Sequence, residues 1–266
     1  MYSVTQRIRN IKQPRGGYIM PRNFNAKDFG AIPPNDMHVE TIHASLVGLA
    51  VDYLARFMLG ADVKSAFQIS TIGAWAMDNF DKSMCHCANA HKLCEQIKGL
   101  DDVSIIAACK LVGYDSAFRA GPIAYRPVEN IQPDRATCEN IREMVKSSLE
   151  FFRVYGPVTR ERIVFPGGYT ETVSSGDGDF MTADTIWDFK CSVRPPQSKD
   201  TLQIVMYWLM GLHSICSAEF EKVTKFGFFN PRLAKIYTLN VANVSPETLH
   251  EIEVQVIGYS VDDALF

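Results

Sequence analysis

The apolar positions between residues 199 and 217 recur at the spacing of a helix. This segment reads KDTLQIVMYWLMGLHSICS, and its large apolar residues fall three or four positions apart, as one helical face requires. Asp200 and Thr201 are residue types that can begin a helix by capping it. The pattern therefore predicts an amphipathic helix over 199–217.

The residues on either side of this segment predict a second helix and several strands. Apolar residues three or four positions apart predict a helix over 134–153. Runs of β-branched and aromatic residues predict the strands. These strands cover 161–165, 169–174, 185–189, 225–229 and 235–241. The order along the chain is helix, three strands, helix and further strands, which is typical of an α/β fold.

The N-terminal half is predicted to be mostly helical. Helical patterns cover 37–59, 62–79, 81–98 and 101–111, and the last three open with an aspartate at a capping position. We expect residues 1–133 to form a basic arm and a helical lobe, and residues 134–266 to form an α/β core. Because no linker rich in glycine, serine or proline separates these halves, we expect one compact body.

The strand around Trp187 carries polar residues that a buried strand does not need. Asp188 and Lys190 are two residues apart, so their side chains point to the same face. A tight hairpin would bring Asp179, at the end of the preceding strand, beside them. Two carboxylates form a hard-oxygen site for Mg²⁺ or Mn²⁺, and a nearby lysine can activate water or offset negative charge. The alternative is a surface hairpin with ordinary charges, but an unpaired Asp and Lys inside a sheet are costly.

The helix that follows adds a third motif. Gln203 and Tyr207 are four residues apart and share one face of the predicted helix. The order Gly-x-Asp, Asp-x-Lys and Gln-x-x-x-Tyr resembles the PD-(D/E)XK nuclease superfamily, in its RecB-like branch. The resemblance covers residues 134–243 and implies an αβββαβ restriction-endonuclease-like core with a helical N-terminal extension.

The resemblance implies a metal-dependent nuclease that hydrolyses phosphodiester bonds of DNA, with RNA as the alternative substrate. Asp179, Asp188 and the backbone carbonyl of Phe189 would bind the metal, and Lys190 would act beside them. Gln203 and Tyr207 would support the site. Relatives supply a further glutamate from the helix before the first strand; Glu139, Glu143 and Glu150 are candidates here, and we favour Glu143.

A second function is also consistent with the resemblance. The fold can serve as a binding module, with weak or absent cleavage, in a phage-defence, mobile-element or anti-defence assembly. The chain has no Walker-type or Rossmann glycine loop, so a helicase or other ATPase would be a separate subunit. The intact Asp179, Asp188 and Lys190 set favours the enzyme.

Charge adds candidate contacts for nucleic acid. The chain carries a net charge of −3, yet residues 1–30 hold six lysines and arginines against Asp28 alone. This segment either tracks phosphates, with Arg15 beside a flexible Gly-Gly-Tyr, or is a solvated terminus or a contact for a partner subunit. Arg194 and Lys199, just after the Asp188 strand, are at positions to meet backbone phosphates.

Cysteine usage indicates reduced thiols. The chain has seven cysteines, an odd number, and no secretory signal or membrane-length apolar run, so we expect a cytoplasmic protein without a membrane segment. Cys87, His91 and Cys94 share a helical face that would suit zinc or an iron–sulfur cluster. We do not expect the four-cysteine iron–sulfur cluster of some RecB-like nucleases, because no cysteine follows Cys216. Partly buried thiols are the simpler interpretation.

Overall fold

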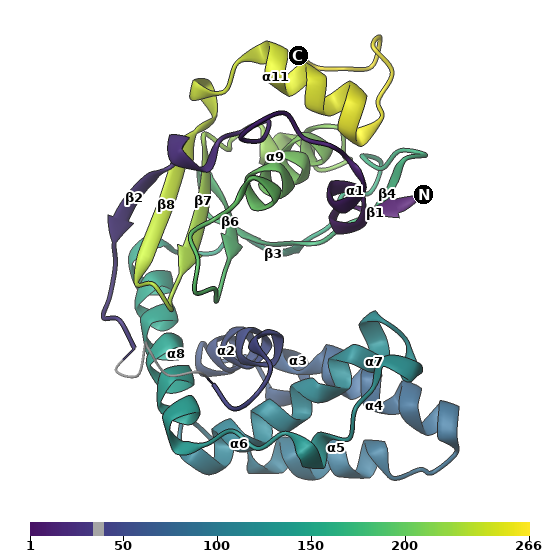
Figure 1. The fold of residues 1–266 in the computed structure, drawn as a ribbon, viewed down its shortest axis with the longest axis vertical. Coiled ribbons are helices and arrows are strands. Elements are labelled where there is room, and N and C mark those ends of the chain that lie inside the picture. Colours follow the sequence, from purple (N-terminus) through teal and green to yellow (C-terminus); the bar gives the residue numbers. More distant parts are fainter. Residues whose placement is uncertain (34–39) are drawn as a thin grey trace. The chain divides into compact units, whose positions relative to one another are not determined.

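The computed structural model describes residues 1–33 and 40–266, and its contacts divide the chain into two units. Unit 1 comprises Met1–Phe29 together with Phe151–Phe266, and unit 2 comprises Gly30–Glu150 (Figure 1). This division differs from the expected boundary at residue 134. The first 29 residues group with the C-terminal part of the chain instead of with the helices that follow them.

Unit 1 is built on a six-stranded mixed sheet in the order β2-β8-β7-β6-β5-β3. Strands β6 and β7 are parallel, and every other neighbouring pair in this sheet is antiparallel. The strands are β2 (Asn25–Asp28), β3 (Arg160–Ile163), β5 (Gly178–Met181), β6 (Thr185–Phe189), β7 (Lys225–Asn230) and β8 (Lys235–Asn240). The chain is therefore a mixed α/β protein with a mostly antiparallel sheet.

Helices and a second, two-stranded sheet complete unit 1. The parallel connection from β6 to β7 runs through α9 (Ser198–Leu212), which corresponds to the helix predicted over 199–217. The other elements are β1 (Tyr2–Ser3), α1 (Val4–Asn10), η1 (Pro21–Asn23), β4 (Val173–Ser175), α10 (Ser217–Phe220), η5 (Val241–Asn243), α11 (Pro246–Glu251) and a π-helix, η6 (Ile252–Ile257). The long helix α8 (Arg135–Tyr155) confirms the helix predicted over 134–153, and its last residues belong to unit 1.

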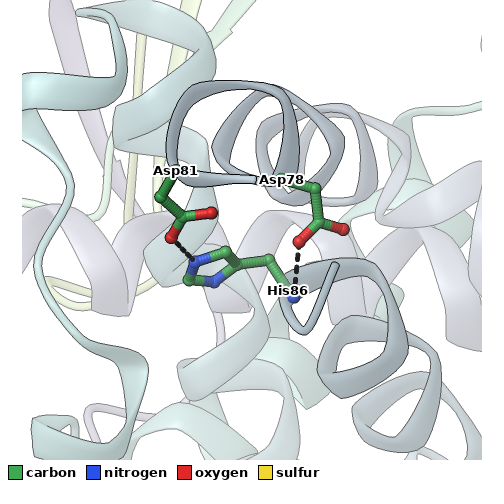
Figure 2. A group of neighbouring side chains, drawn as sticks. All are labelled: Asp78, Asp81 and His86. Carbon is green, nitrogen blue, oxygen red and sulfur yellow. Dashed lines mark hydrogen bonds and ion pairs between the residues drawn. The ribbon is translucent and has the colours of Figure 1, made fainter. Parts of the chain in front are cut away.

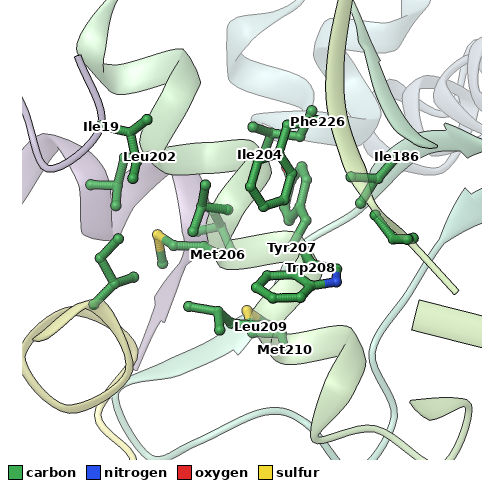
Figure 3. Packing of buried hydrophobic residues seen from close by; sticks show 14 of the residues in the cluster. Ile19, Ile186, Leu202, Ile204, Met206, Tyr207, Trp208, Leu209, Met210 and Phe226 are labelled. Carbon is green, nitrogen blue, oxygen red and sulfur yellow. The ribbon is translucent and has the colours of Figure 1, made fainter. Parts of the chain in front are cut away.

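The two faces of the sheet bury different groups of side chains. Ile186 faces the main core, where α9 contributes more of the buried residues than any other element (Figure 3). Trp187 faces the other side, against Phe151 from the end of α8 with ring centroids 4.9 Å apart. This alternation is what a strand covered on both faces requires. It leaves Asp188 on the same face as Ile186 and therefore on the side of α9.

One predicted strand is not part of the main sheet. Residues 169–174 were expected to form a strand, but only Val173–Ser175 is extended, as β4, and it pairs with β1. The Thr170 hydroxyl accepts hydrogen bonds from the backbone N–H groups of Thr172 and Val173, at 3.1 and 2.9 Å. This side chain closes a local turn, an alternative to strand pairing that threonine offers the backbone.

The basic N-terminal segment is an integral part of unit 1. Val4, Ile8, Ile19 and Phe24 are buried in the main core, among residues of α9 and the sheet. Arg7 donates hydrogen bonds to the carbonyls of Val256 and Gln255, at 2.8 and 2.7 Å. The apolar residues of this segment therefore anchor it. Of the six basic residues expected on the arm, five are exposed and Arg7 is half-buried.

Unit 2 consists of helices. They are α2 (Ala44–Met58), α3 (Val63–Ala66), α4 (Gln68–Asp81), α5 (His86–Gln96), α6 (Asp102–Leu111), η2 (Val112–Tyr114), α7 (Asp115–Arg119), η3 (Pro122–Ala124) and η4 (Val128–Asn130), followed by the first part of α8. Of the helix expected over 37–59, residues 37–39 lie outside the described residues; residues 40–43 are not helical, and α2 begins at Ala44. Asp62 and Asp101 cap helices as predicted, with side chains that accept from the N–H groups of Ser65 and Ser104. Asp81, which was expected to open the helix over 81–98, is instead the last residue of α4, and α5 begins at His86. Across residues 1–33 and 40–266, no helix combines the length and apolarity needed to cross a membrane.

Candidate active site

The hairpin of β5 and β6 sets Asp179 opposite Asp188. Its register pairs Phe180 with Trp187 and Met181 with Ile186, and one further step in the same register pairs the two aspartates. Residues directly opposite each other in an antiparallel pair project to the same face. The Phe189 N–H donates to Asp179 Oδ2 at 2.6 Å, which fixes the Asp179 carboxylate against the end of β6.

Lys190 links this hairpin to helix α9. Its Nζ atom lies 2.8 Å from Asp188 Oδ2 and donates to Gln203 Oε1 at 3.3 Å. Gln203 Nε2 in turn donates to the Tyr207 hydroxyl at 2.7 Å. The structure therefore brings together the five residues singled out by the three sequence motifs, Asp179, Asp188, Lys190, Gln203 and Tyr207, in one group within unit 1.

A sixth residue, Asp200, belongs to the same group and was not expected there. It lies three residues before Gln203 and seven before Tyr207, so the three side chains share one face of α9. Asp200 Oδ1 is 3.8 Å from Lys190 Nζ, and Asp200 Oδ2 accepts the Gln197 N–H at 2.8 Å. The helix cap is thus Gln197, and Asp200 is the third helical residue. The spacing to Gln203 was the sequence signal for its placement.

Two glycines make room for the Tyr207 ring. A Cβ atom on Gly176 would lie 3.3 Å from Tyr207 Cε1 and only 2.7 Å from Val4 Cγ2. A Cβ atom on Gly178 would lie 3.4 Å from Tyr207 Cδ2 and 3.3 Å from two atoms of Ile163. The Gly-Asp-Gly-Asp sequence therefore serves packing as well as chemistry, because its glycines let α9 approach the hairpin closely.

The Asp188 carboxylate is buried without full compensation. The residue is 4% exposed, and its buried Oδ2 atom accepts no hydrogen bond among the described residues. Lys190 lies at ion-pair distance from this oxygen, but not in the direction of a hydrogen bond. Burial raises the pKa of Asp188; Lys190 opposes this effect and Asp200 adds to it. An oxygen in this state retains the capacity to bind a cation.

Lys190 is held in its charged form. Burial alone would lower the pKa of Lys190, but the negative charges of Asp188, Asp200 and Asp179 outweigh burial and raise it above the ordinary value. Burial also raises the pKa of Tyr207, with further contributions from nearby aspartates. At neutral pH the site therefore contains an ammonium group and a neutral phenol, and Lys190 does not act as a general base in this arrangement.

The donor set fits a magnesium-like ion. Asp179 and Asp188 offer two carboxylates, and one or two carboxylates together with substrate phosphates are the usual protein contribution to a Mg²⁺ site. Among the described residues, these two aspartates and a third His, Cys, Asp or Glu do not form a group whose ligand atoms all lie within 4.8 Å of one another. The buried Asp188 Oδ2 atom, which lacks a hydrogen bond, is the observation that favours a cation here.

A different group in unit 2 also has ligand atoms close together. Asp78, Asp81 and His86 place one ligand atom each within 4.8 Å of one another (Figure 2). The Asp78 carboxylate accepts from the N–H groups of His86 and Cys87, at 2.8 and 2.9 Å, and so caps α5. Asp81 Oδ2 contacts His86 Nε2 at 2.8 Å. These hydrogen bonds account for the convergence of the three side chains without a metal.

The cysteine and histidine face of α5 forms no such group. Cys87, His91 and Cys94 line a small pocket of about 200 Å³ in unit 2. Within the described residues their ligand atoms do not converge to 4.8 Å. Burial raises the pKa of Cys87 to about 11, and a hydrogen bond to the Asp78 carboxylate adds to this effect. Cys87 is therefore a protonated thiol at neutral pH, although the residue is exposed and Cys94 is the buried member of the three.

The remaining predicted residues are not part of the bonded group around Asp188. Glu143 is in unit 2, where its carboxylate forms an ion pair of 2.6 Å with Lys146. Arg194 and Lys199 are exposed in unit 1, on the segment that joins β6 to the first turn of α9. Arg15 is exposed two residues before Gly17, which packs against Ser198 at the start of α9.

Comparison of the chain with protein-family models, with curated proteins and with solved structures gave no match.

Proposed function

We propose that the protein is a metal-dependent nuclease that hydrolyses phosphodiester bonds of DNA, and that Asp179 and Asp188 bind Mg²⁺ or Mn²⁺. The observation that carries the proposal is the buried Asp188 Oδ2 atom, which has no hydrogen bond and lies opposite a second carboxylate and beside Lys190. Two such carboxylates beside an ammonium group suit a site where a cation and a phosphate meet.

The order of elements in unit 1 supports the proposed relationship to the PD-(D/E)XK superfamily. The sequence α8, β3, β5, β6, α9 and β7 corresponds to the expected αβββαβ core, once the short β1–β4 pair is set aside. β3, β5 and β6 are consecutive antiparallel strands, and β7 returns parallel to β6 through α9. Asp179 and Asp188 lie on the central strands of this core, and Lys190 follows directly after β6.

The residues of the site would divide the work of hydrolysis. A divalent ion bound by Asp179 and Asp188 would lower the pKa of a water molecule and offset charge on the scissile phosphate. Lys190, as an ammonium group, stabilises negative charge that develops on the phosphate oxygens. Gln203 orients Lys190 through its carbonyl oxygen, and Tyr207 orients Gln203 by accepting its N–H.

The decisive experiment uses purified protein with linear, circular and single-stranded DNA, and with RNA, in Mg²⁺, Mn²⁺ or excess EDTA. We expect cleavage of DNA with either metal and none in EDTA. Asp188→Asn removes the charge with little change of shape and should abolish cleavage, whereas Asp262→Asn, an exposed control in the same unit, should not.

Three outcomes would count against the proposal. Cleavage that persists in EDTA would reject the metal mechanism, and cleavage of RNA alone would change the substrate class. Nucleic-acid binding without cleavage under any condition would favour the binding-module alternative instead.

A further inference from the structure

A pocket of about 270 Å³ adjoins the paired aspartates in unit 1. Its lining comes from the segment after β6 and from the first turn of α9, and it includes Lys190, Arg194, Lys199 and Asp200. Pro195 and Pro196 stiffen this segment because proline fixes the backbone φ angle. The Asn230 side chain donates to the Ser192 carbonyl at 2.8 Å and ties the segment to the end of β7.

The pocket is more positive than the carboxylate site beside it. Three of its lining side chains are cationic, and its one acidic side chain, Asp200, is already engaged by the Gln197 N–H and by Lys190. The pocket also lies at the N-terminus of the 15-residue helix α9, where the helix dipole favours an anion. Arg194 and Lys199 are exposed, so a ligand can reach both.

The pocket and the carboxylate site share two residues. Lys190 lines the pocket and lies 2.8 Å from Asp188 Oδ2, and Asp200 lines it and lies 3.8 Å from Lys190 Nζ. An anion in the pocket is therefore the immediate neighbour of a phosphate at Asp179 and Asp188. The volume is below that of most sites for drug-sized ligands, which is about 300–1,000 Å³, so it suits one backbone phosphate and its sugar.

We propose that this pocket is a phosphate subsite, which holds the backbone phosphate next to the one cleaved at Asp179 and Asp188. This inference rests on the proposed nuclease function and refines its substrate class. The preferred substrate is a polynucleotide with at least two consecutive phosphates, because a simple phosphodiester reaches the carboxylates but leaves the pocket empty. Arg194 and Lys199 then determine the preference for polynucleotides and take no part in bond cleavage.

The test compares two substrates in the double variant Arg194→Ala/Lys199→Ala. One substrate is a single-stranded oligonucleotide, and the other is bis(p-nitrophenyl) phosphate, which has one phosphate. We expect KM for the oligonucleotide to rise about tenfold or more, the loss typical of a charge-assisted contact. The kcat/KM for bis(p-nitrophenyl) phosphate should stay within about twofold, since its hydrolysis needs only the carboxylate site.

A matched control removes the same charge elsewhere. Lys92→Ala/Lys222→Ala deletes two exposed lysines that do not line the pocket and should leave both substrates unaffected. The pair Arg194→Lys/Lys199→Arg keeps both charges and should restore most of the affinity for the oligonucleotide. Equal losses on both substrates, or no loss on the oligonucleotide, would overturn the proposal.

A binding measurement separates this inference from the nuclease function itself. In the Asp188→Asn background, the slope of log Kd against log salt for a single-stranded oligonucleotide should become shallower by about 0.7 when Arg194 and Lys199 are replaced, because one phosphate contact is lost. An unchanged slope would reject the subsite even if the protein cleaves DNA. A changed slope in a protein that never cleaves would retain the subsite and reject the nuclease.

Discussion

The paired aspartates of unit 1 and the Asp78, Asp81 and His86 group of unit 2 contain similar ligand types in opposite states. In unit 2 each member of the group has a partner: Asp78 accepts two backbone N–H groups, and Asp81 contacts the His86 ring. In unit 1 the buried Asp188 Oδ2 atom accepts no hydrogen bond among the described residues. Convergence of metal-ligating side chains is therefore weaker evidence for a site than a buried carboxylate oxygen that has an ion-pair partner but accepts no hydrogen bond.

The direction of the pKa shifts gives the same contrast. Hydrogen bonds from His86 and Cys87 outweigh burial and leave the pKa of Asp78 below its ordinary value, so its charge stabilises the fold. Burial raises the pKa of Asp188, so its charge is a cost to the fold. Function is a common reason for a protein to retain such a cost.

The largest expected difference is in cleavage. Asp188→Asn should reduce kcat about a thousandfold, the upper range for loss of one electrostatic element of a site. Asp78→Asn should leave the kcat of the folded protein unchanged. Single-turnover cleavage of labelled DNA measures both variants. If the Asp78→Asn variant is fully folded but does not cleave, the unit 2 group is part of the active site, and the two groups no longer differ in function.

Lys190 is the next most sensitive position. Lys190→Met keeps the length of the side chain and removes its charge, so kcat should fall about a hundredfold, as expected for a group that acts electrostatically. Affinity for DNA should change little, because Lys190 acts on the reacting phosphate. Fluorescence anisotropy in the presence of Ca²⁺ measures affinity, and Lys222→Met is the control. A collapse of affinity would show that Lys190 is mainly a phosphate anchor.

For the free energy of unfolding, substitution of Asp78 should have a larger effect than substitution of Asp188, which is the reverse of the order expected for cleavage. Asp78→Ala leaves two N–H groups at the start of α5 without their acceptor, and should lower the free energy of unfolding by about 1–3 kcal/mol. Asp188→Asn relieves the cost of a buried carboxylate but also removes the ion-pair partner of Lys190, so its net effect on the free energy of unfolding should be smaller. Urea denaturation followed by circular dichroism measures both. Destabilisation by Asp188→Asn that equals that of Asp78→Ala would give the unit 1 carboxylate a structural role.

The smallest expected effect is on how the stability of the protein depends on pH below neutrality. Hydrogen bonds from the Ser83 N–H and from His86 lower the pKa of Asp81 to about 2, from an ordinary value of 3.8. A lowered carboxyl pKa adds stability that is present above pH 3.8 and is lost as the pH falls toward 2. Asp81→Asn should therefore be less stable than the wild type at pH 5 and equal to it near pH 2. A difference that does not change with pH would exclude this ionic contribution.

The sequence was most informative where the structure depends on local patterns. The helix 134–153 follows from apolar spacing and is present as α8. The contact between Asp179 and the end of β6 follows from a tight hairpin with few residues between its strands. Gln203 and Tyr207 share a face because they are one turn apart. In each case the residues that meet are close in the sequence, so periodicity suffices to bring them together.

Local sequence patterns could not predict which distant strands pair or which hydrogen bonds individual side chains make. The N-terminal strand β2 pairs Asn25 with Thr238, and nothing in the short run around Asn25 indicates that partner. The turn closed by Thr170 replaced an expected strand, because a single hydroxyl took up the local N–H groups. Asp200 was one of two candidates, with Thr201, for the helix cap, and its approach to Lys190 depends on how α9 docks on the sheet.

The arrangement of unit 1 also has a consequence for how the chain is made. Its segment Met1–Phe29 leaves the ribosome before the rest of unit 1, but the strand that β2 needs, β8, is synthesised more than 200 residues later, at Lys235–Asn240. Unit 2 is continuous in the sequence, so all of its residues emerge before most of unit 1 exists. We therefore expect unit 2 to fold first during translation, while the N-terminal segment, with Val4 and Ile8 still exposed, depends on chaperones until β8 emerges.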